Sequence, residues 1–280
     1  MARSGPWSGE VELSPAELAS AAPAAPAAAP SGFRPRRFLP FASFLLLLAL
    51  WVLAAELAQG SRTLPGPLAV LEAAWRELLA GELLHHLAAT LGRVGASFAI
   101  AMTVGSAIGI AMGRSAWADE FGRPWLLLGL NMPALVTIVL CYVWIGLVEA
   151  AAVTAVALNK IPNVAVTVRE GAKALDRGLL EMAQAFAVPR GRVLAHLVLP
   201  QLAPYLLGAA RSGLALVWKI VLVVELLGRP NGVGFQIHTA FQLFDVATIL
   251  AYALAFVAIV QLIEWGALEP LARRLQRWRR

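Results

Sequence analysis

Charged residues are scarce in this sequence. Asp, Glu, Lys and Arg make up 14% of its 280 residues, whereas hydrophobic residues make up 59%. An average soluble domain is roughly 25% charged, so the composition argues against a soluble protein with one buried core. The single cysteine, Cys141, excludes an internal disulfide and a cluster of thiolate metal ligands. The net charge is +6, but the basic residues lie beside apolar runs, which favours membrane topology over nucleic-acid binding as their explanation.

Motifs that would mark an enzyme are also missing. The sequence has no GxxxxGK[ST] phosphate-binding loop and no HExxH or paired-cysteine metal pattern. His85 and His86 would point to different sides of a helix, and the other two histidines stand alone. We therefore expect no catalytic residues, no metal ion and no cofactor. The few acidic residues inside apolar runs argue against a proton-driven carrier.

Six apolar runs are long enough to cross a bilayer, which takes about 20 helical residues. They predict an all-α integral membrane protein with spans near 38–57, 88–112, 124–146, 149–168, 204–227 and 246–267. These spans would form one membrane domain, residues 38–270.

The two ends of the chain differ from this domain in composition. Residues 1–37 are rich in Ala and Pro and end in the basic patch RPRR, which predicts a disordered tail, and residues 271–280 predict a short basic tail. A cleaved signal peptide is the alternative for the first run. Its charged segment would begin unusually late, and no clear cleavage site follows Leu53.

The distribution of Lys and Arg predicts the orientation. With the N-terminus in the cytoplasm, sixteen of these residues fall in inside segments, and three, Arg62, Arg76 and Arg229, fall outside. Cytoplasmic segments of membrane proteins are enriched in Lys and Arg. We therefore expect a multi-pass protein of the cytoplasmic (inner) membrane, with both termini and residues 171–200 in the cytoplasm.

The segment 171–200 is the longest internal cytoplasmic connection, and it includes EMAQAFAVPRGRVLAHLVLP. Its composition predicts two short helices. Pro189 should end the first or open the second, and Pro200 should break the second before the fifth span. One interpretation is a connector on the lipid headgroups, with its arginines paired with anionic lipid.

The order of residues favours another interpretation, because this segment resembles the EAA loop of permease subunits from binding-protein-dependent ABC importers. The positions that carry the comparison are Glu181, Met182, Ala183, Ala187, Pro189, Leu199 and Pro200. Met182 departs from the family's first alanine, and Ala187 stands where the family usually has glycine, so Pro189 is expected to supply the turn. The stretches LPGPLAVLEAAW, HLAATLGRVGASFAIAMTVGSAIGIAMG and VVELLGRPNGVGFQI are similar to parts of nitrate/sulfonate/taurine/bicarbonate-type permeases.

The resemblance implies a fold and a set of partners. The fold would be that of a type I ABC importer permease, with a cytoplasmic EAA coupling loop and a homodimer around the solute path. An ATPase subunit would dock at the loop and hydrolyse ATP, and a periplasmic or lipid-anchored binding protein would deliver the solute. The solute would be a small anion of the nitrate, sulfonate, taurine or bicarbonate class. The alternatives are a self-sufficient secondary carrier or channel, and an ABC permease for a non-anionic molecule.

Two lysines fall within predicted spans. Lys160 and Lys219 would lie about 16 Å and 12 Å below the outer surface at 1.5 Å per helical residue. Intramembrane charge is costly and usually faces a cavity or a partner. Together with Asn163 and Ser212, these lysines form a candidate pathway for an anion.

Other polar and small residues in the spans leave alternatives open. Glu149 or Glu225 could instead pair with the lysines, which would make them structural. Arg93 and Arg211 lie nearer span ends, where snorkelling explains them. A small-xxx-small series favours packing within one subunit slightly over a dimer seam. Its members are Gly105, Gly109 and Gly113.

Overall fold

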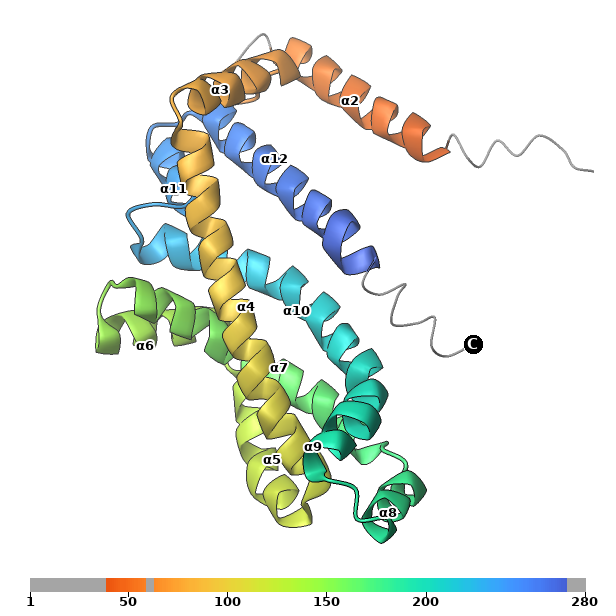
Figure 1. Ribbon diagram of the computed structural model, residues 1–280. Helices are drawn as coiled ribbons and strands as arrows, with labels where there is room; N and C mark the ends of the chain where they lie inside the picture. The colour runs from red at the N-terminus through yellow and green to blue at the C-terminus, as the bar shows by residue number, and fades with distance from the viewer. Residues whose placement is uncertain (1–38, 59–62, 271–280) are drawn as a thin grey trace, which may run out of the picture. The chain divides into compact units, whose positions relative to one another are not determined.

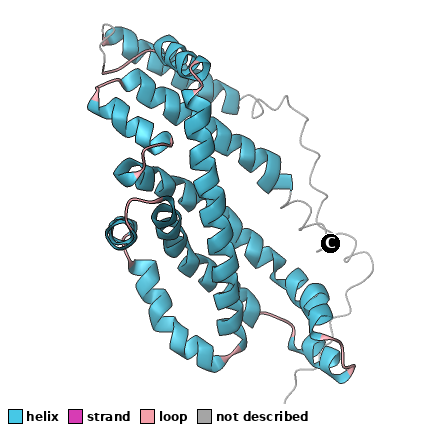
Figure 2. Ribbon diagram, turned by 60° about the vertical axis from the view of Figure 1, so that its left-hand side comes forward, coloured by secondary structure: helices cyan, strands magenta, loops and turns pink. Residues whose placement is uncertain are grey.

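The computed structural model describes residues 39–58 and 63–270, which form helices and connecting turns without a strand (Figure 2). The predicted tails 1–37 and 271–280 lie outside the described residues. The chain divides into two units, residues 1–49 and residues 50–280, and each is described by itself. The described part of the first unit is the beginning of helix α2 (Leu39–Leu57), which is apolar along this stretch.

The second unit holds the end of α2 and the remaining helices (Figure 1). These are α3 (Pro67–Leu79), α4 (Glu82–Arg114), α5 (Ala116–Asn131), α6 (Ala134–Ile145), α7 (Glu149–Lys173), α8 (Arg177–Ala185), α9 (Arg190–Val193), α10 (Leu199–Gly228), α11 (Val233–Gln242) and α12 (Val246–Ile263). Among the described residues, four helices are long and apolar enough to cross a membrane, or five if one bent pair counts as a single span. Helices α4 and α7 extend well beyond the predicted 88–112 and 149–168.

The bent pair consists of α5 and α6, whose axes meet at 98°. The prediction of one continuous helix over 124–146 is therefore wrong. The break falls at Met132 and Pro133, and Pro133 caps α6 with extended backbone. Proline has no N–H and restricts the preceding residue to extended conformations, which explains why the helix stops there.

Helices α4 and α7 form the most extensive contact between elements. A methyl group on Gly105 would lie 2.7 Å from Val164 Cβ, and one on Gly109 would lie 2.6 Å from the Ala165 carbonyl oxygen. Gly113 is in equally close contact with Ala172. The glycine series therefore packs within one subunit, as expected. Because residue numbers rise together along both helices, α4 and α7 run parallel.

Helix α10 begins differently from the prediction. Residues Arg190–Gly228 form one helical run of 39 residues, in which a π-helical turn, Leu194–Val198, joins α9 to α10. Pro200 lies in the first turn of α10 and does not break the run. In a π-helical turn the hydrogen bonds reach back five residues, and this local change of spacing just before Pro200 accommodates its missing N–H.

Candidate functional site

Helix α8 is the core of the predicted coupling segment. Asp176 caps its N-terminus, because its Oδ1 accepts a hydrogen bond from the Leu179 N–H at 3.2 Å. The Asp176 N–H donates in turn to Gln201 Oε1 at 2.9 Å. The start of α8 is thus bonded directly to α10, so a displacement of α8 can be passed to a long apolar helix.

The two faces of α8 have different environments. Ala183 is buried, whereas Glu181 is exposed. The exposed face also carries large apolar side chains, since Met182 is 49% and Phe186 77% exposed. Exposed apolar residues beside polar ones are typical of a protein-binding surface.

The turn after α8 is made at Ala187, whose φ of 49° lies in the left-handed region. The Ala187 N–H donates to Gln184 O, and the Val188 N–H donates to Ala183 O at 2.9 Å. This pattern resembles a helix C-cap, where glycine is usual. The expectation that Pro189 supplies the turn is wrong, because Pro189 lies after it and caps α9.

We expect Ala187→Gly to stabilise this turn by about 1 kcal/mol, because glycine adopts the left-handed conformation without a steric penalty. Hydrogen exchange at the amides of α8 and the turn should slow. The matched control is Ala185→Gly in the last position of α8, where glycine costs about 1 kcal/mol and exchange should accelerate. Faster exchange in both variants would contradict the assignment of a strained alanine.

The first turn of α5 and the last turns of α7 are joined by ion pairs to Asp119, which is buried. Asp119 accepts hydrogen bonds from the Arg169 guanidinium, including one from Nη2 at 2.8 Å, and from Lys173 Nζ at 2.8 Å. Arg123 lies 3.3 Å away. The carboxylate therefore fixes the start of the bent pair against the end of α7.

A second charged network joins the opposite ends of α4, α7 and α10. Arg93 is only 3% exposed. Its Nε donates to Glu149 Oε1 at 2.6 Å, and its Nη1 donates to Glu225 Oε1 at 2.7 Å. Nη1 also donates to the Asn231 carbonyl oxygen at 2.9 Å, and Nη2 to the Asn231 side chain. Arg229 pairs with the other oxygen of Glu149 at 2.7 Å, so two cations balance two carboxylates.

Glu225 extends this network to the loop before α11. Its Oε2 accepts hydrogen bonds from Thr90 Oγ1 at 3.0 Å and from the Gly234 N–H at 2.8 Å. The Val233 N–H donates to Thr90 Oγ1, and the Gly232 N–H donates to His86 Nδ1, both at 2.9 Å. Glu225 has no exposed area, and it accepts hydrogen bonds from three separate donors, which are Arg93, Thr90 and the Gly234 N–H.

The sequence prediction that Arg93 snorkels is therefore wrong, and so is the pairing of Glu149 or Glu225 with lysines. The partners of Arg93 lie 56, 132 and 138 residues away in sequence. The sequence does indicate a polar face on this helix, since His86, Thr90 and Arg93 fall on one side of it. Nothing in their spacing identifies which other spans they meet.

Lys160 is 2% exposed and lies between α7 and α10. A methyl group on Gly213 would be 2.5 Å from Lys160 Cε, so the absence of a side chain there makes room for the lysine. Among the described residues, the Lys160 ammonium group has no hydrogen bond or ion pair within the chain. Asn163 is one turn further along α7, half-buried, with its amide pointing back to Asn159 O at 3.4 Å.

Lys219 is exposed and lies in a groove between α10 and α12 with a volume of about 420 Å³. Arg211 and Glu264 also line this groove, whereas Lys160 does not. Ser212 is exposed on α10 and donates to Ala209 O at 3.4 Å. The structure thus separates the two lysines, although Lys160 contacts α10 at the residue next to Ser212.

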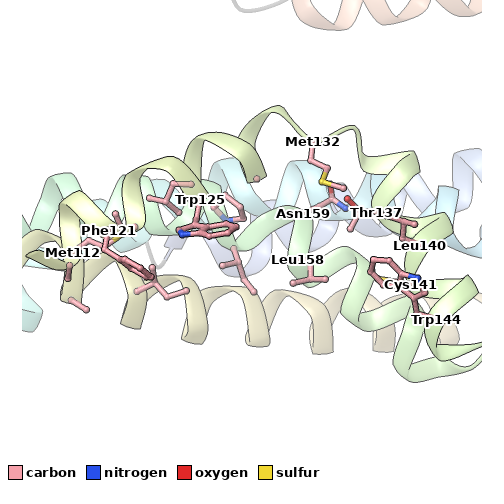
Figure 3. Close-up of a pocket in the computed structure, with 18 of the residues that line it drawn as sticks. Met112, Phe121, Trp125, Met132, Thr137, Leu140, Cys141, Trp144, Leu158 and Asn159 are labelled. Carbon is pink, nitrogen blue, oxygen red and sulfur yellow. The ribbon is translucent and has the colours of Figure 1, made fainter.

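A larger groove of about 600 Å³ lies inside the angle of the bent pair, where α4, α5, α6 and α7 meet (Figure 3). Trp125 and Trp144 face it from the two arms of the pair, and Leu158 and Asn159 face it from α7. No charged residue lines it. Its chemistry suits an apolar occupant and not an inorganic anion.

A family model described as "Binding-protein-dependent transport system inner membrane component" matches residues 101–266, which include α8 and both lysines. The chain belongs to this family. It is a permease subunit of an ABC transporter, a multi-pass protein of the inner membrane and a non-catalytic component of its complex. The membership confirms the resemblance inferred from residues 181–200, and it implies an ATPase and a solute-binding protein as partners.

Individual relatives agree with this assignment. The chain is 30% identical over 246 residues to the taurine transport system permease protein TauC of Escherichia coli K12, covering 86% of this chain and 89% of the relative. It is 28% identical over 237 residues to the riboflavin transport system permease protein RibX of Chloroflexus aurantiacus, covering 84% and 88%. The relatives therefore differ widely in the solute that their names give.

A solved structure shares the fold. A chain of the MetNI methionine ABC transporter, in an inward-facing conformation, superimposes with a TM-score of 0.61 at 18% identity. The superposition covers 71% of this chain and 98% of that one. The ABC importer permease architecture expected from the EAA-like segment is therefore confirmed at the level of fold.

Proposed function

We propose that the chain is the membrane-spanning subunit of an ATP-driven importer that carries a small anion into the cytoplasm. Two copies would face each other, and the anion would pass between them. The relative named for taurine transport supports a sulfonate as the solute class. The observation that carries the proposal is a small, cationic and uncovered face of α10.

That face repeats at helical spacing along α10. Its members are Gly208, Ser212, Ala215 and Lys219, all of which are exposed in the single chain. Arg211 lies in the same groove as Lys219 and adds a second positive charge, against the one negative charge of Glu264 on the opposite wall. Small residues allow a second subunit to approach closely, and a row of cations lowers the cost of moving an anion through a low-dielectric region.

The ion-pairing pattern supports an anion over a cation. Within the described residues, the buried carboxylates are occupied, Glu225 by Arg93 and Asp119 by Arg169 and Lys173. Lys160 has no carboxylate partner in the chain. A buried ammonium requires compensation, and a passing anion supplies it. A non-anionic solute is the second candidate, which the relative named for riboflavin favours.

The proposed topology has six spans, with the bent pair α5–α6 crossing as one broken span. Helices α4 and α7 run parallel and lie side by side over most of the length of α7. The pair between them must then return across the same depth, which a re-entrant loop would not do. With α2 as the first span, both termini are cytoplasmic, in agreement with the Lys and Arg distribution.

Cysteine accessibility tests this orientation. In a Cys141→Ala background, Ala185→Cys in α8 should react with a membrane-impermeant reagent only after the cells are permeabilised, so that the reagent reaches the cytoplasmic face. A cysteine at Leu243, exposed after α11, should react from outside in intact cells. Labelling of position 185 from outside would overturn the six-span arrangement.

We further propose that the exposed face of α8 docks in the ATPase subunit and that Glu181, with Met182, lies in this contact. Reversing the charge in Glu181→Lys should reduce ATP-driven uptake by about tenfold or more, since like charges at an interface cost several kcal/mol. Membrane insertion should be unchanged. The measurement is uptake in proteoliposomes, together with the amount of ATPase that co-purifies.

The matched control is Glu120→Lys, an exposed acidic residue at the cytoplasmic end of α5. It should retain both uptake and ATPase association. Normal uptake by Glu181→Lys would contradict the docking proposal and would leave residues 171–200 as a connector between two spans.

A further inference from the structure

A cavity with polar and apolar walls lies beside α8, and neither Met182 nor Phe186 lines it. It has a volume of about 800 Å³, opens to the surface, and is bordered by α8, the turn at Ala187, the start of the α9–α10 run and the last residue of α4. Leu180, Ala183 and Val198 form its apolar wall. Its polar side chains are Arg114, Gln184 and Arg190, and no acidic residue lines it.

The two arginines of this cavity are unlike their neighbours. Among the described residues, neither the Arg114 nor the Arg190 guanidinium makes a hydrogen bond or ion pair within the chain. Arg169 and Lys173, which lie at the same end of the helices, are both paired with Asp119. Asp119 follows Arg114 by only five residues, yet its oxygens are taken by other cations. Two guanidinium groups are thus left to face the cavity without a counter-ion.

We infer that this cavity binds the phosphate headgroup of an anionic phospholipid from the cytoplasmic leaflet. The guanidinium fork matches the geometry of phosphate oxygens and forms strong, charge-assisted hydrogen bonds with them. The apolar wall would contact the glycerol and upper acyl carbons. Arg114 ends α4, a helix that crosses the membrane, so the cavity opens where headgroups of the cytoplasmic leaflet lie in the orientation proposed above.

A lipid in this site would also affect how movement of the ATPase is passed through α8 to the spans, because the site lies between α8 and those spans. Met182 and Phe186 are exposed and do not line the cavity, so they stay free for the ATPase. A bound headgroup would therefore support α8 from behind without competing for its docking face. This inference rests on the proposed orientation, but binding of the lipid can be measured without any partner subunit.

The test uses the purified full chain in nanodiscs that contain phosphatidylglycerol and phosphatidylcholine, followed by native mass spectrometry of the lipid retained per chain. Arg114→Gln and Arg190→Gln should each lower the retention of phosphatidylglycerol about fivefold, the factor expected for one basic residue near an anionic surface. Gln184→Glu, which places a negative charge in the cavity without removing an arginine, should lower it as well. Phosphatidylcholine retention should not change.

The matched control is Arg192→Gln, an exposed arginine two residues beyond Arg190 that does not line the cavity. It should retain phosphatidylglycerol as the unaltered chain does. An equal loss in this control would overturn the proposal in favour of a general attraction of basic residues to the membrane. Displacement of phosphatidylglycerol by millimolar inorganic phosphate would overturn it in favour of a site for the free ion. Because no ATPase is present, failure of coupling cannot produce either result.

Discussion

Replacing Arg93 by methionine should lower the free energy of unfolding of the membrane domain by about 3–5 kcal/mol, the cost typical of breaking a buried ion pair from one side. The change would leave Glu225 fully buried without its cationic partner. It would also remove the hydrogen bonds to Asn231 that hold the loop before α11. The measurement is thermal unfolding of the purified chain, with the yield of folded protein recorded beside it.

The control is Arg123→Met, whose guanidinium is largely exposed and pairs with Asp119 at 3.3 Å. Exposed pairs contribute about 0–1 kcal/mol, so its melting temperature should change little. The double variant Arg93→Met with Glu225→Gln should recover part of the loss, because no buried charge is left unpaired at position 225. Equal melting temperatures for Arg93→Met and Arg123→Met would show that the network contributes nothing to stability.

The second large effect is expected at the lysines. Lys160→Met and Lys219→Met should each reduce uptake per assembled complex by about 10- to 100-fold, the range expected when one charged hydrogen-bonding partner of the solute is lost. Assembly and ATPase association should persist, because within the described chain Lys160 leaves no carboxylate unpaired when it is removed. Lys→Arg should retain part of the activity, since it keeps the charge but changes geometry and hydration.

A variant that keeps the Lys160 charge but shifts its position distinguishes a role of Lys160 in the solute pathway from a role in packing. Gly213→Ala would place a methyl group 2.5 Å from Lys160 Cε and force the side chain to shift. Gly95→Ala on α4, where nothing lies within 4 Å of the added methyl group, is its matched control outside the α10 face. Uptake should fall in the first variant and be retained in the second. Normal uptake by well-assembled Lys160→Met and Lys219→Met would remove the case for an anion pathway.

Four of the six predicted spans coincide with long apolar helices among the described residues, because apolar length is a property of each run by itself. Helices α4, α7, α10 and α12 lie where the apolar runs do, and the glycines of α4 do pack within the subunit. The 98° bend between α5 and α6 could not be predicted, since both arms are apolar and Pro133 alone does not distinguish a kink from a sharp turn. Likewise, Pro200 predicts a break in the helix, whereas the π-helical turn just before it has no sequence signal.

The candidate site is only partly readable from the sequence for a related reason. The candidate coupling segment is readable because its residues are contiguous and resemble a known motif. The unusual backbone at Ala187 was indicated by the glycine that the family usually has there, although the turn was assigned to Pro189. The role of Arg93 has no sequence signal, because its partners are brought together only by the packing of three helices.

We expect this chain to move a solute only when an ATPase drives it. The decisive measurement is uptake of radiolabelled taurine into proteoliposomes. These hold the chain together with the ATPase subunit that co-purifies when the chain is isolated by affinity purification. Taurine should accumulate when ATP is inside and the solute-binding protein is outside, and accumulation should stop when any one of the three is left out. Accumulation by the chain alone, without ATPase or ATP, would contradict the account and identify a self-sufficient carrier.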